Sequence, residues 1–350
     1  MPVKLFIHAT NIHQGGGQTL LHALLSTFPR NIELTAQLDT RMKVSEEILE
    51  GIQIRRVKPT LMQRLLAELW LARNVKSGDF VLCFGSLPPL FNLQGHVAVF
   101  VQNRYLLEKT GLKNFPIKTK LRINIERIWL HMKASNTNVF LVQTPSMKRL
   151  LQSKIKTFSS VYVMPFAGIK EGYKRSLNQQ DSQRGNLYDF IYIASGEPHK
   201  NHRQLVEAWC LLASENIFPS LCLTINKKNS ANLCYWIDEK KKLHGLRLEN
   251  QGELPHDQIM KLYSQARAMV YPSTFESFGF PLIEARQAGL PVLAGELDYV
   301  RDMLDPEQSF DPGSALSIAR AVKRFLGHDE SALPLVEAAD FLKNIMEMVT

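Results

Sequence analysis

Short apolar runs alternate with helical patterns along almost the whole chain, and this alternation constrains the fold more than any other feature. Apolar runs bounded by turn residues predict buried strands, and apolar residues at helical spacing predict the helices that cover them. Parallel strands need such crossover helices, so the order predicts parallel α/β sheets. In the first half we predict strands at residues 3–8, 32–38, 52–57, 80–84, 97–102, 139–143 and 161–164, with helices at 18–28 and 61–73.

The alternation lapses in a polar stretch at residues 168–186. It resumes with predicted strands at 190–194, 221–225, 246–250, 268–271 and 291–294, and helices at 201–213, 231–244, 257–266, 280–288, 314–326 and 332–348. We therefore predict an N-terminal Rossmann-like domain (1–168), a linker (169–186), a C-terminal Rossmann-like domain (187–330) and a C-terminal helix (331–350) that can pack back on the first domain. Two doubly wound domains in series place a ligand cleft between the carboxyl ends of two parallel sheets.

Charge is divided unevenly between the two halves. Residues 1–168 carry 22 Lys and Arg against 9 Asp and Glu, a net of +13, whereas residues 169–350 carry 20 against 24, a net of −4. The apolar run at the N-terminus is too short for a signal peptide, and no window approaches the ~20 apolar residues of a membrane-spanning helix. The sequence thus predicts a cytoplasmic protein whose first domain is basic.

The most informative motif is Y-P-S-T-F-E-S-F-G-F-P-L-I-E-A at residues 271–285, a strand end followed by a turn and a helix start. Pro281 suits the first turn of a helix, where its missing N–H is not needed. The backbone amides of Ser277, Phe278 and Gly279 are then expected to be unpaired at a helix N-terminus. Such a terminus favours a phosphate group.

Two carboxylates flank this turn. Glu284 lies one helical turn beyond Pro281, within reach of a ribose diol, and Glu276 precedes the phosphate site, where a sugar would lie. Taken alone, Glu284 could equally complement the helix dipole, and Glu276 could be a surface acid. Their shared Pro-Ser-x-x-Glu-Ser-Phe-Gly context favours a site for a sugar nucleotide.

Two further loops follow predicted strands and precede predicted helices. The first, Y-I-A-S-G-E-P-H-K-N at residues 192–201, offers Lys200 to a diphosphate. The second, Q-G-G-G-Q at residues 14–18, contains Gly16 and Gly17, which allow the backbone to approach a phosphate or an acceptor closely. A dinucleotide fold is the alternative for this loop, but its third glycine position is Leu20.

Together these motifs resemble glycosyltransferase family 4, the retaining nucleotide-sugar transferases with the GT-B fold. The resemblance continues through G-E-L-P-H-D-Q-I-M-K-L-Y-S-Q-A-R (252–267), A-G-L-P-V-L-A-G (288–295) and F-D-P (310–312), so it covers essentially the whole second half. It implies that Glu284 binds the ribose, that Glu276 contacts the transferred sugar and that Lys200 neutralises the leaving diphosphate. The implied donor site comprises Ser195, Lys200, Glu276, Ser277, Phe278, Gly279, Leu282, Glu284, Gly16 and Gly17, with Glu276 and Lys200 as its catalytic residues; some relatives have Arg at the position of Ser195.

The resemblance also implies a reaction. A hexose, mannose-type or similar, would move from a nucleotide diphosphate sugar to a lipid-linked oligosaccharide or a lipopolysaccharide O-antigen acceptor, at the cytoplasmic face of an inner membrane. No metal-binding motif or Walker lysine occurs, so we expect no metal and no cofactor besides the nucleotide-sugar co-substrate. The alternatives are a GT-B sugar-nucleotide epimerase or phosphorylase, and a non-catalytic nucleotide-sugar-binding protein.

The sequence departs from the family after the predicted strand at 97–102. Many members have His-Asp there, whereas this chain has Gln102, Asn103 and Arg104, so we assign no catalytic base and group these three residues with the acceptor or membrane side. The basic residues that follow, interleaved with apolar ones, are Lys109, Lys113, Lys118, Lys120 and Arg122. This pattern suits an anionic membrane surface or a lipid-diphosphate acceptor, with a solvated helix as the alternative. The sequence contains no aromatic stacking motif and no recognition-helix pattern that would indicate nucleic-acid binding.

Overall fold

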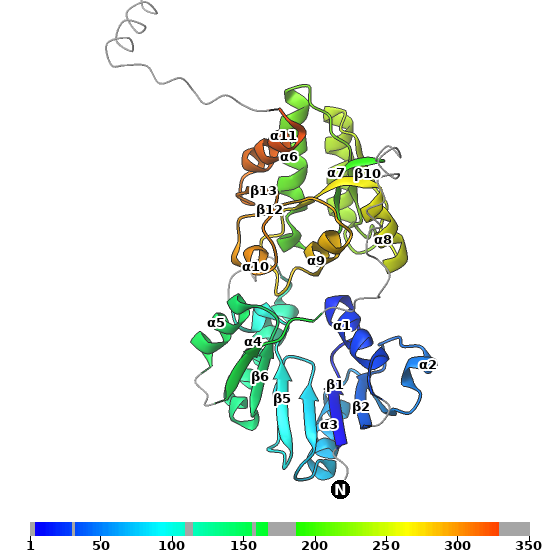
Figure 1. Ribbon diagram of the computed structural model, residues 1–350, viewed down its shortest axis with the longest axis vertical. Coiled ribbons are helices and arrows are strands. Elements are labelled where there is room, and N and C mark those ends of the chain that lie inside the picture. The colour runs from blue at the N-terminus through cyan, green and yellow to red at the C-terminus, as the bar shows by residue number, and fades with distance from the viewer. Residues whose placement is uncertain (1–3, 30–31, 109–114, 156–158, 167–186, 329–350) are drawn as a thin grey trace, which may run out of the picture.

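The computed structural model describes residues 4–29, 32–108, 115–155, 159–166 and 187–328, which form two α/β domains stacked along the long axis of the molecule (Figure 1). The N-terminal domain contains a seven-stranded sheet in the order β3-β2-β1-β4-β5-β6-β7, and the C-terminal domain a six-stranded sheet in the order β10-β9-β8-β11-β12-β13. All paired strands are parallel. The predicted linker (169–186) and C-terminal helix (331–350) lie outside the described residues.

The strands and helices of the N-terminal domain alternate as the apolar pattern predicts. The strands are β1 (Lys4–Ala9), β2 (Glu33–Asp39), β3 (Gln53–Val57), β4 (Phe80–Cys83), β5 (His96–Phe100), β6 (Val139–Val142) and β7 (Ser160–Val163). The helices are α1 (Gly15–Ser26), α2 (Glu46–Leu49), α3 (Leu61–Asn74), α4 (Ile117–Met132) and α5 (Pro145–Lys154), with short 3-10 turns η1 (Arg104–Leu106) and η3 (Ala134–Asn136).

The C-terminal domain repeats this arrangement. Its strands are β8 (Tyr188–Tyr192), β9 (Leu221–Leu223), β10 (Leu248–Asn250), β11 (Ala266–Tyr271), β12 (Val292–Gly295) and β13 (Gln308–Phe310). Its helices are α6 (His202–Ser214), α7 (Ala231–His244), α8 (His256–Ser264), α9 (Phe280–Gln287), α10 (Asp298–Arg301) and α11 (Ala315–Leu326), and the 3-10 turn η5 (Pro198–Lys200) precedes α6.

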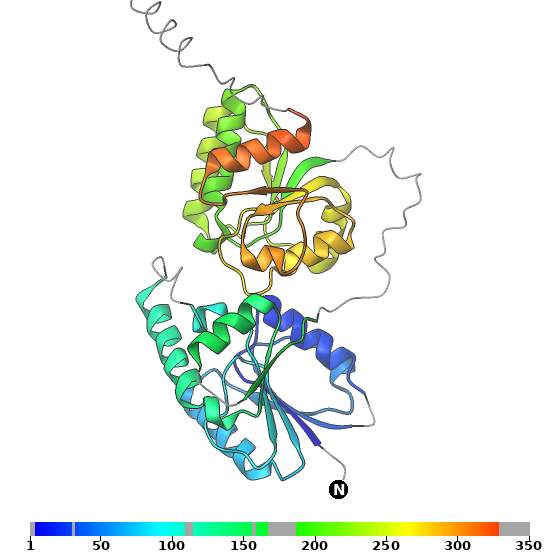
Figure 2. The same ribbon diagram turned by 60° about the vertical axis from the view of Figure 1, so that its left-hand side comes forward.

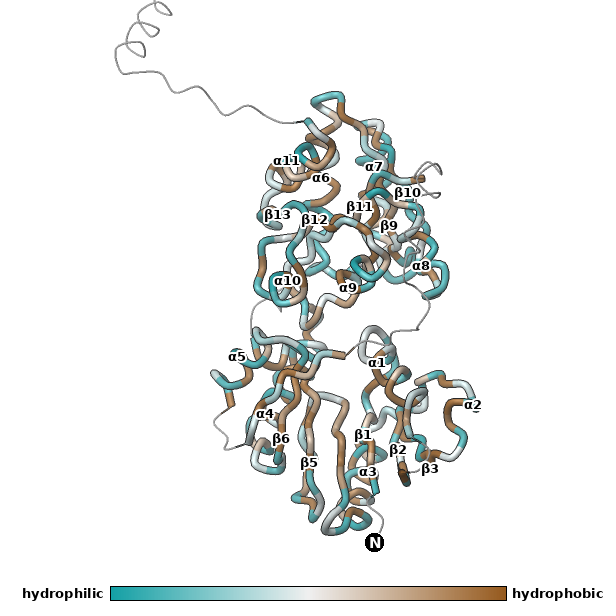
Figure 3. Tube along the Cα trace, in the orientation of Figure 1, coloured by the Kyte–Doolittle hydropathy of each residue, from teal (hydrophilic) through white to brown (hydrophobic). Residues whose placement is uncertain are grey.

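Helices cover both faces of each sheet (Figures 1 and 2), which explains why the strands are continuously apolar (Figure 3). In the N-terminal domain, α3, α4 and α5 pack on one face through Leu71, Leu130 and Leu151, and α1 packs on the other through Leu20 and Leu21. A single larger core fills the C-terminal domain.

The strand order reverses at one point in each sheet, between β1 and β4 and between β8 and β11. Open α/β sheets bind ligands outside the carboxyl ends of the strands at such a switch point. The two domains meet there: Phe280 of the C-terminal domain packs against the α1-side core of the N-terminal domain, and the amide of Ser146 donates to Asp302 Oδ2 at 2.9 Å. The fold therefore directs both switch points toward the domain interface.

Candidate functional site

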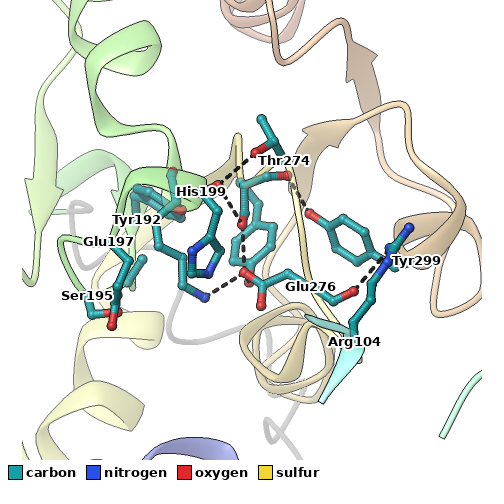
Figure 4. A network of polar contacts seen from close by, with 12 residues as sticks. Arg104, Tyr192, Ser195, Glu197, His199, Thr274, Glu276 and Tyr299 are labelled. Carbon is teal, nitrogen blue, oxygen red and sulfur yellow. Dashed lines mark hydrogen bonds and ion pairs between the residues drawn. The ribbon is translucent and has the colours of Figure 1, made fainter. Parts of the chain in front are cut away.

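The switch point of the C-terminal sheet brings two predicted residues into contact. Lys200, in the turn after β8, and Glu276, in the turn after β11, form an ion pair with 2.6 Å between Nζ and Oε1 (Figure 4). Their side chains are 16% and 14% exposed, so each charge is largely removed from water but still reachable from the interface. The two residues are 76 positions apart in sequence and meet because β8 and β11 are adjacent parallel strands.

The carboxylate of Glu276 has further donors. Ser273 Oγ donates to Oε1 at 2.6 Å, and the Tyr271 hydroxyl donates to the same oxygen at 3.0 Å. Burial alone would raise the pKa of Glu276, but the charge and hydrogen bond of Lys200 and the hydroxyl of Ser273 outweigh it and lower the pKa below its usual value. Glu276 is therefore an ionised group at neutral pH.

The turn after β11 is tied to the loop after β8. The carbonyl of His199 accepts from the amide of Thr274 at 2.8 Å, and the side-chain amide of Asn201 donates to the carbonyls of Pro272 and Pro312 at 3.1 and 2.6 Å. Asn201 reaches both because its backbone adopts the left-handed conformation, with φ of 62°, which Asn tolerates better than most residues. These bonds fix Lys200 and Glu276 relative to each other.

The N-terminus of α9 presents the predicted amides. Gly279 is the N-cap with φ of 71°, and Phe280 and Pro281 begin the helix. Within the described part of the chain, the amides of Ser277, Phe278 and Gly279 donate no hydrogen bond. Three unpaired N–H groups beside a Lys make this turn suited to an anion such as a diphosphate.

Glu284 lies one turn further along α9 and is mostly buried, with 13% of its side chain exposed. The Tyr263 hydroxyl donates to Oε2 at 3.1 Å, and His256 Nδ1 lies 3.5 Å from Oε1. Burial raises the pKa of Glu284 to about 7, although the Tyr263 hydrogen bond opposes this. Ligand hydroxyl groups that donate hydrogen bonds to this carboxylate would stabilise its ionised form.

The N-terminal domain contributes the opposite wall, from the loop after β5. Arg104 donates its backbone amide to Ser277 Oγ at 3.1 Å and its guanidinium to the Glu276 carbonyl at 3.2 Å, and it lies 4.8 Å above the Phe275 ring. Tyr105 stacks on that ring at 4.4 Å. The sequence does not single out Tyr105 or Phe275, because no local pattern distinguishes either residue from other aromatic residues. Their contact appears only when the two domains are placed together.

The sequence groups Arg104 with the acceptor or membrane residues, and the structure places it at the contact between the two domains. Its side chain is 15% exposed and paired with Glu108, and it faces the donor-side turn instead of an outer surface. Gln102 and Asn103 form hydrogen bonds within the N-terminal domain. Gln102 Nε2 donates to the Phe84 carbonyl at 2.8 Å, and Asn103 Oδ1 accepts from the Tyr105 amide at 3.1 Å.

Four other predicted site residues are placed as follows. Leu282 is fully buried and its amide donates to the Gly279 carbonyl, so it supports the turn from below without facing a ligand. Gly16 and Gly17 lie in the first turn of α1, which begins at Gly15 and not at residue 18, because the extended Gln14 already serves as the N-cap. Ser195 is exposed and its hydroxyl donates to Glu197.

The predicted basic residues occupy the outer side of the N-terminal domain. Lys118 and Arg122 are exposed on α4 and Lys120 is half-buried, while Lys109 and Lys113 lie outside the described residues. Among the residues that the structure covers, no group of His, Cys, Asp or Glu converges as a metal site. In the same part of the chain, no helix is long and apolar enough to cross a membrane.

Known proteins resemble this chain in sequence and in structure. The family model described as Glycosyl transferases group 1 matches residues 174–340. The serotype-specific mannosyltransferase WbdA of Escherichia coli is 29% identical over 161 residues, which cover 44% of this chain and 19% of WbdA. The O-antigen chain mannosyltransferase B of Escherichia coli is 30% identical over 142 residues, 40% of this chain and 37% of that protein. The chain therefore matches well under half of the length of either relative.

A solved structure extends the likeness to nearly the whole chain. Anabaena HepE, in complex with UDP and glucose, is similar with a TM-score of 0.65 and 15% identity, over 93% of this chain and 90% of HepE. This likeness confirms the predicted fold, GT-B with two Rossmann-like domains.

Proposed function

Because the C-terminal half of the chain belongs to the group 1 glycosyl transferases, we propose that the protein is a retaining glycosyltransferase. It moves a hexose, of mannose type or similar, from a nucleotide diphosphate sugar to a lipid-linked oligosaccharide or a lipopolysaccharide O-antigen acceptor. The names of the two Escherichia coli relatives support the sugar and the acceptor, and the UDP and glucose bound to HepE support the donor class.

The observation that carries the proposal is the Lys200–Glu276 ion pair beside the unpaired amides of the α9 N-terminus. A nucleotide diphosphate sugar needs a cation and N–H donors at its phosphates and an acceptor of hydrogen bonds at its sugar hydroxyls. The site offers these groups side by side, and Glu284 stands further along α9, where the ribose of the same ligand would lie.

Catalysis would rest on charge stabilisation. The bond between the sugar C1 and the phosphate oxygen breaks while a bond from C1 to the acceptor oxygen forms on the same face, and the acceptor proton passes to the leaving phosphate oxygen. Lys200 and the amides of Ser277 to Gly279 stabilise the negative charge that develops on the diphosphate. Glu276 holds the sugar, and the wall formed by Arg104 and Tyr105 closes the site so that the reacting groups stay oriented.

The test begins with ligand binding. A panel of UDP-, GDP- and TDP-sugars is screened by thermal shift, because a ligand of the native state stabilises it by mass action. The donor that binds is then incubated with lipid extract, and transfer is measured for wild type, Lys200→Ala and Glu276→Ala. We expect both variants to lose at least ~100-fold in turnover, since each removes a group that acts on the transition state.

Lys240→Ala is a matched control, because Lys240 forms a similar ion pair with Glu207 at 2.8 Å, away from the site. It is expected to keep wild-type turnover. Near-normal transfer by folded Lys200→Ala or Glu276→Ala contradicts the site. Donor isomerisation or phosphorolysis without an acceptor favours the epimerase or phosphorylase alternative, and saturable binding without turnover favours a binding protein.

A further inference from the structure

The helix α4 exposes an apolar stripe on the outside of the N-terminal domain. The stripe consists of Ile117, Leu121, Ile125, Ile128 and Met132, which are 55–83% exposed. Their spacing of three or four residues places them on one face of the helix. Ile123 and Leu130 lie on another face and pack in the core. The fold of this helix therefore does not account for its outer apolar face.

The neighbouring helix α3 also exposes apolar side chains. Leu61, Met62, Leu65 and Leu66, all near its beginning, are 40–88% exposed. The two helices are neighbours, because Arg64 of α3 and Trp129 of α4 line the same small cavity. We call these nine residues the α3–α4 surface. An apolar surface contributed by two adjacent helices is more than the scattered exposed residues of an ordinary surface.

The exposed charged residues of α3 and α4 are basic. Lys118 and Arg122 on α4 and Arg73 on α3 are exposed. The acids of the two helices turn inward: the side chain of Glu68 is 4% exposed and lies 3.0 Å from His8 Nε2, and that of Glu126 is 17% exposed beside Arg122. Apolar side chains with basic neighbours fit an anionic lipid surface, where the apolar groups enter the interface and the cations meet the headgroups.

The position of the surface matches a lipid-linked acceptor. The cavity between α3 and α4 is also lined by Thr10, Asn11 and Gly85, which follow β1 and β4 at the switch point of the N-terminal sheet. A lipid held at the α3–α4 surface thus lies beside the crevice of this domain. A second copy of the chain fits less well, because a two-fold contact would bring like charges together.

We propose that the α3–α4 surface docks the N-terminal domain on an anionic lipid bilayer. The inference rests on the proposed function, because docking would bring the enzyme to a membrane-borne acceptor. It goes beyond the basic residues that follow Arg104 in the sequence, since four of the nine apolar residues come from α3 and the guanidinium of Arg104 faces the donor-side turn.

The experiment is sedimentation of the full chain with vesicles of phosphatidylglycerol and phosphatidylcholine, and with phosphatidylcholine vesicles. The test variant carries Leu121→Asp and Ile125→Asp. The matched control carries Tyr235→Asp and Leu243→Asp on α7, where these side chains are 67% and 77% exposed on the other domain. We expect wild type and control to bind the anionic vesicles, the test variant to bind at least ~10-fold more weakly, and added salt to weaken wild-type binding.

The proposal is overturned if the wild-type protein does not bind anionic vesicles. It is also overturned if the test variant binds them as well as the control variant does. So does a wild-type dimer that becomes monomeric in the test variant without any vesicle binding, because the surface then joins two copies. Donor-induced thermal shifts on the same samples separate the two proposals: wild type that binds vesicles but no nucleotide sugar contradicts the proposed function and leaves docking intact.

Discussion

Replacing Glu284 by Gln is expected to stabilise the unliganded C-terminal domain near pH 8 while it removes the response to nucleotide. Burial raises the pKa of Glu284 to about 7, so ionising this carboxyl in the folded protein is costly. Gln keeps an oxygen that can accept from the Tyr263 hydroxyl, which now lies 3.1 Å from Oε2, but it carries no charge to bury. The same change deprives a ribose diol of its ionised acceptor.

The sign and size follow from proton linkage. The ordinary pKa is 4.5, so between about pH 4.5 and pH 7 the folded state keeps a proton that the unfolded chain has lost, and stability falls as the pH rises through this window. A difference of 7 less 4.5 corresponds to about 3 kcal/mol at most. Because the side chain is partly exposed and the site can relax, we expect a gain of about 1–2 kcal/mol for Glu284→Gln at pH 8, or roughly 2–6 °C in melting temperature.

The assay is thermal melting of wild type and Glu284→Gln at pH 5 and pH 8, with and without the nucleotide found in the donor screen. The stability difference should be large at pH 8 and small at pH 5. Asp238→Asn, which removes an exposed carboxylate on α7, serves as the control and should change neither stability nor nucleotide response. A Glu284→Gln protein that is less stable than wild type at pH 8, or that keeps the full nucleotide shift, refutes the reasoning.

Two further predictions concern contacts that the structure revealed. Arg104→Ala removes a guanidinium that bonds to the Glu276 carbonyl and covers the Phe275 ring, so kcat/KM should fall about 10-fold with little change in melting temperature; unchanged kcat/KM contradicts a positioning role. Gly196→Ala places a Cβ 2.6 Å from Ser230 Cβ and should cost about 1–3 kcal/mol in urea unfolding. Adding Ser230→Gly should recover most of the lost free energy of unfolding. If it does not, this clash is not the cause of the loss.

The fold was largely readable from the sequence because its strands are buried on both faces and therefore continuously apolar. Every predicted strand is present within a few residues, and α7 has the predicted bounds. The short elements α2, α10 and β13 were not predicted, because three or four residues carry too little periodic pattern, and the longer helices α4 and α5 were not assigned either. The start of α1 was placed late, since three glycines argue locally for a loop while the packing of Leu20 and Leu21 sustains the helix.

The sequence predicted only those parts of the candidate site that lie within one continuous motif. The turn at Ser277 to Gly279 and the two acids follow from one continuous motif, and Lys200 from another. The stacking of Tyr105 on Phe275 joins residues far apart in the chain, and no local pattern encodes it. Leu282 shows the opposite failure, because a residue inside a functional motif can serve the core.

The position of Glu276 depends on both domains, and this gives Arg104 a role that its sequence neighbours do not indicate. Lys200 and Ser273 hold the carboxylate from within the C-terminal domain, while the guanidinium of Arg104 holds the carbonyl of the same residue from the N-terminal domain. Separating the domains would break the second contact and leave the first in place, so part of what positions Glu276 depends on the contact between the domains. We therefore infer that Arg104 links the position of Glu276 to the contact between the two domains.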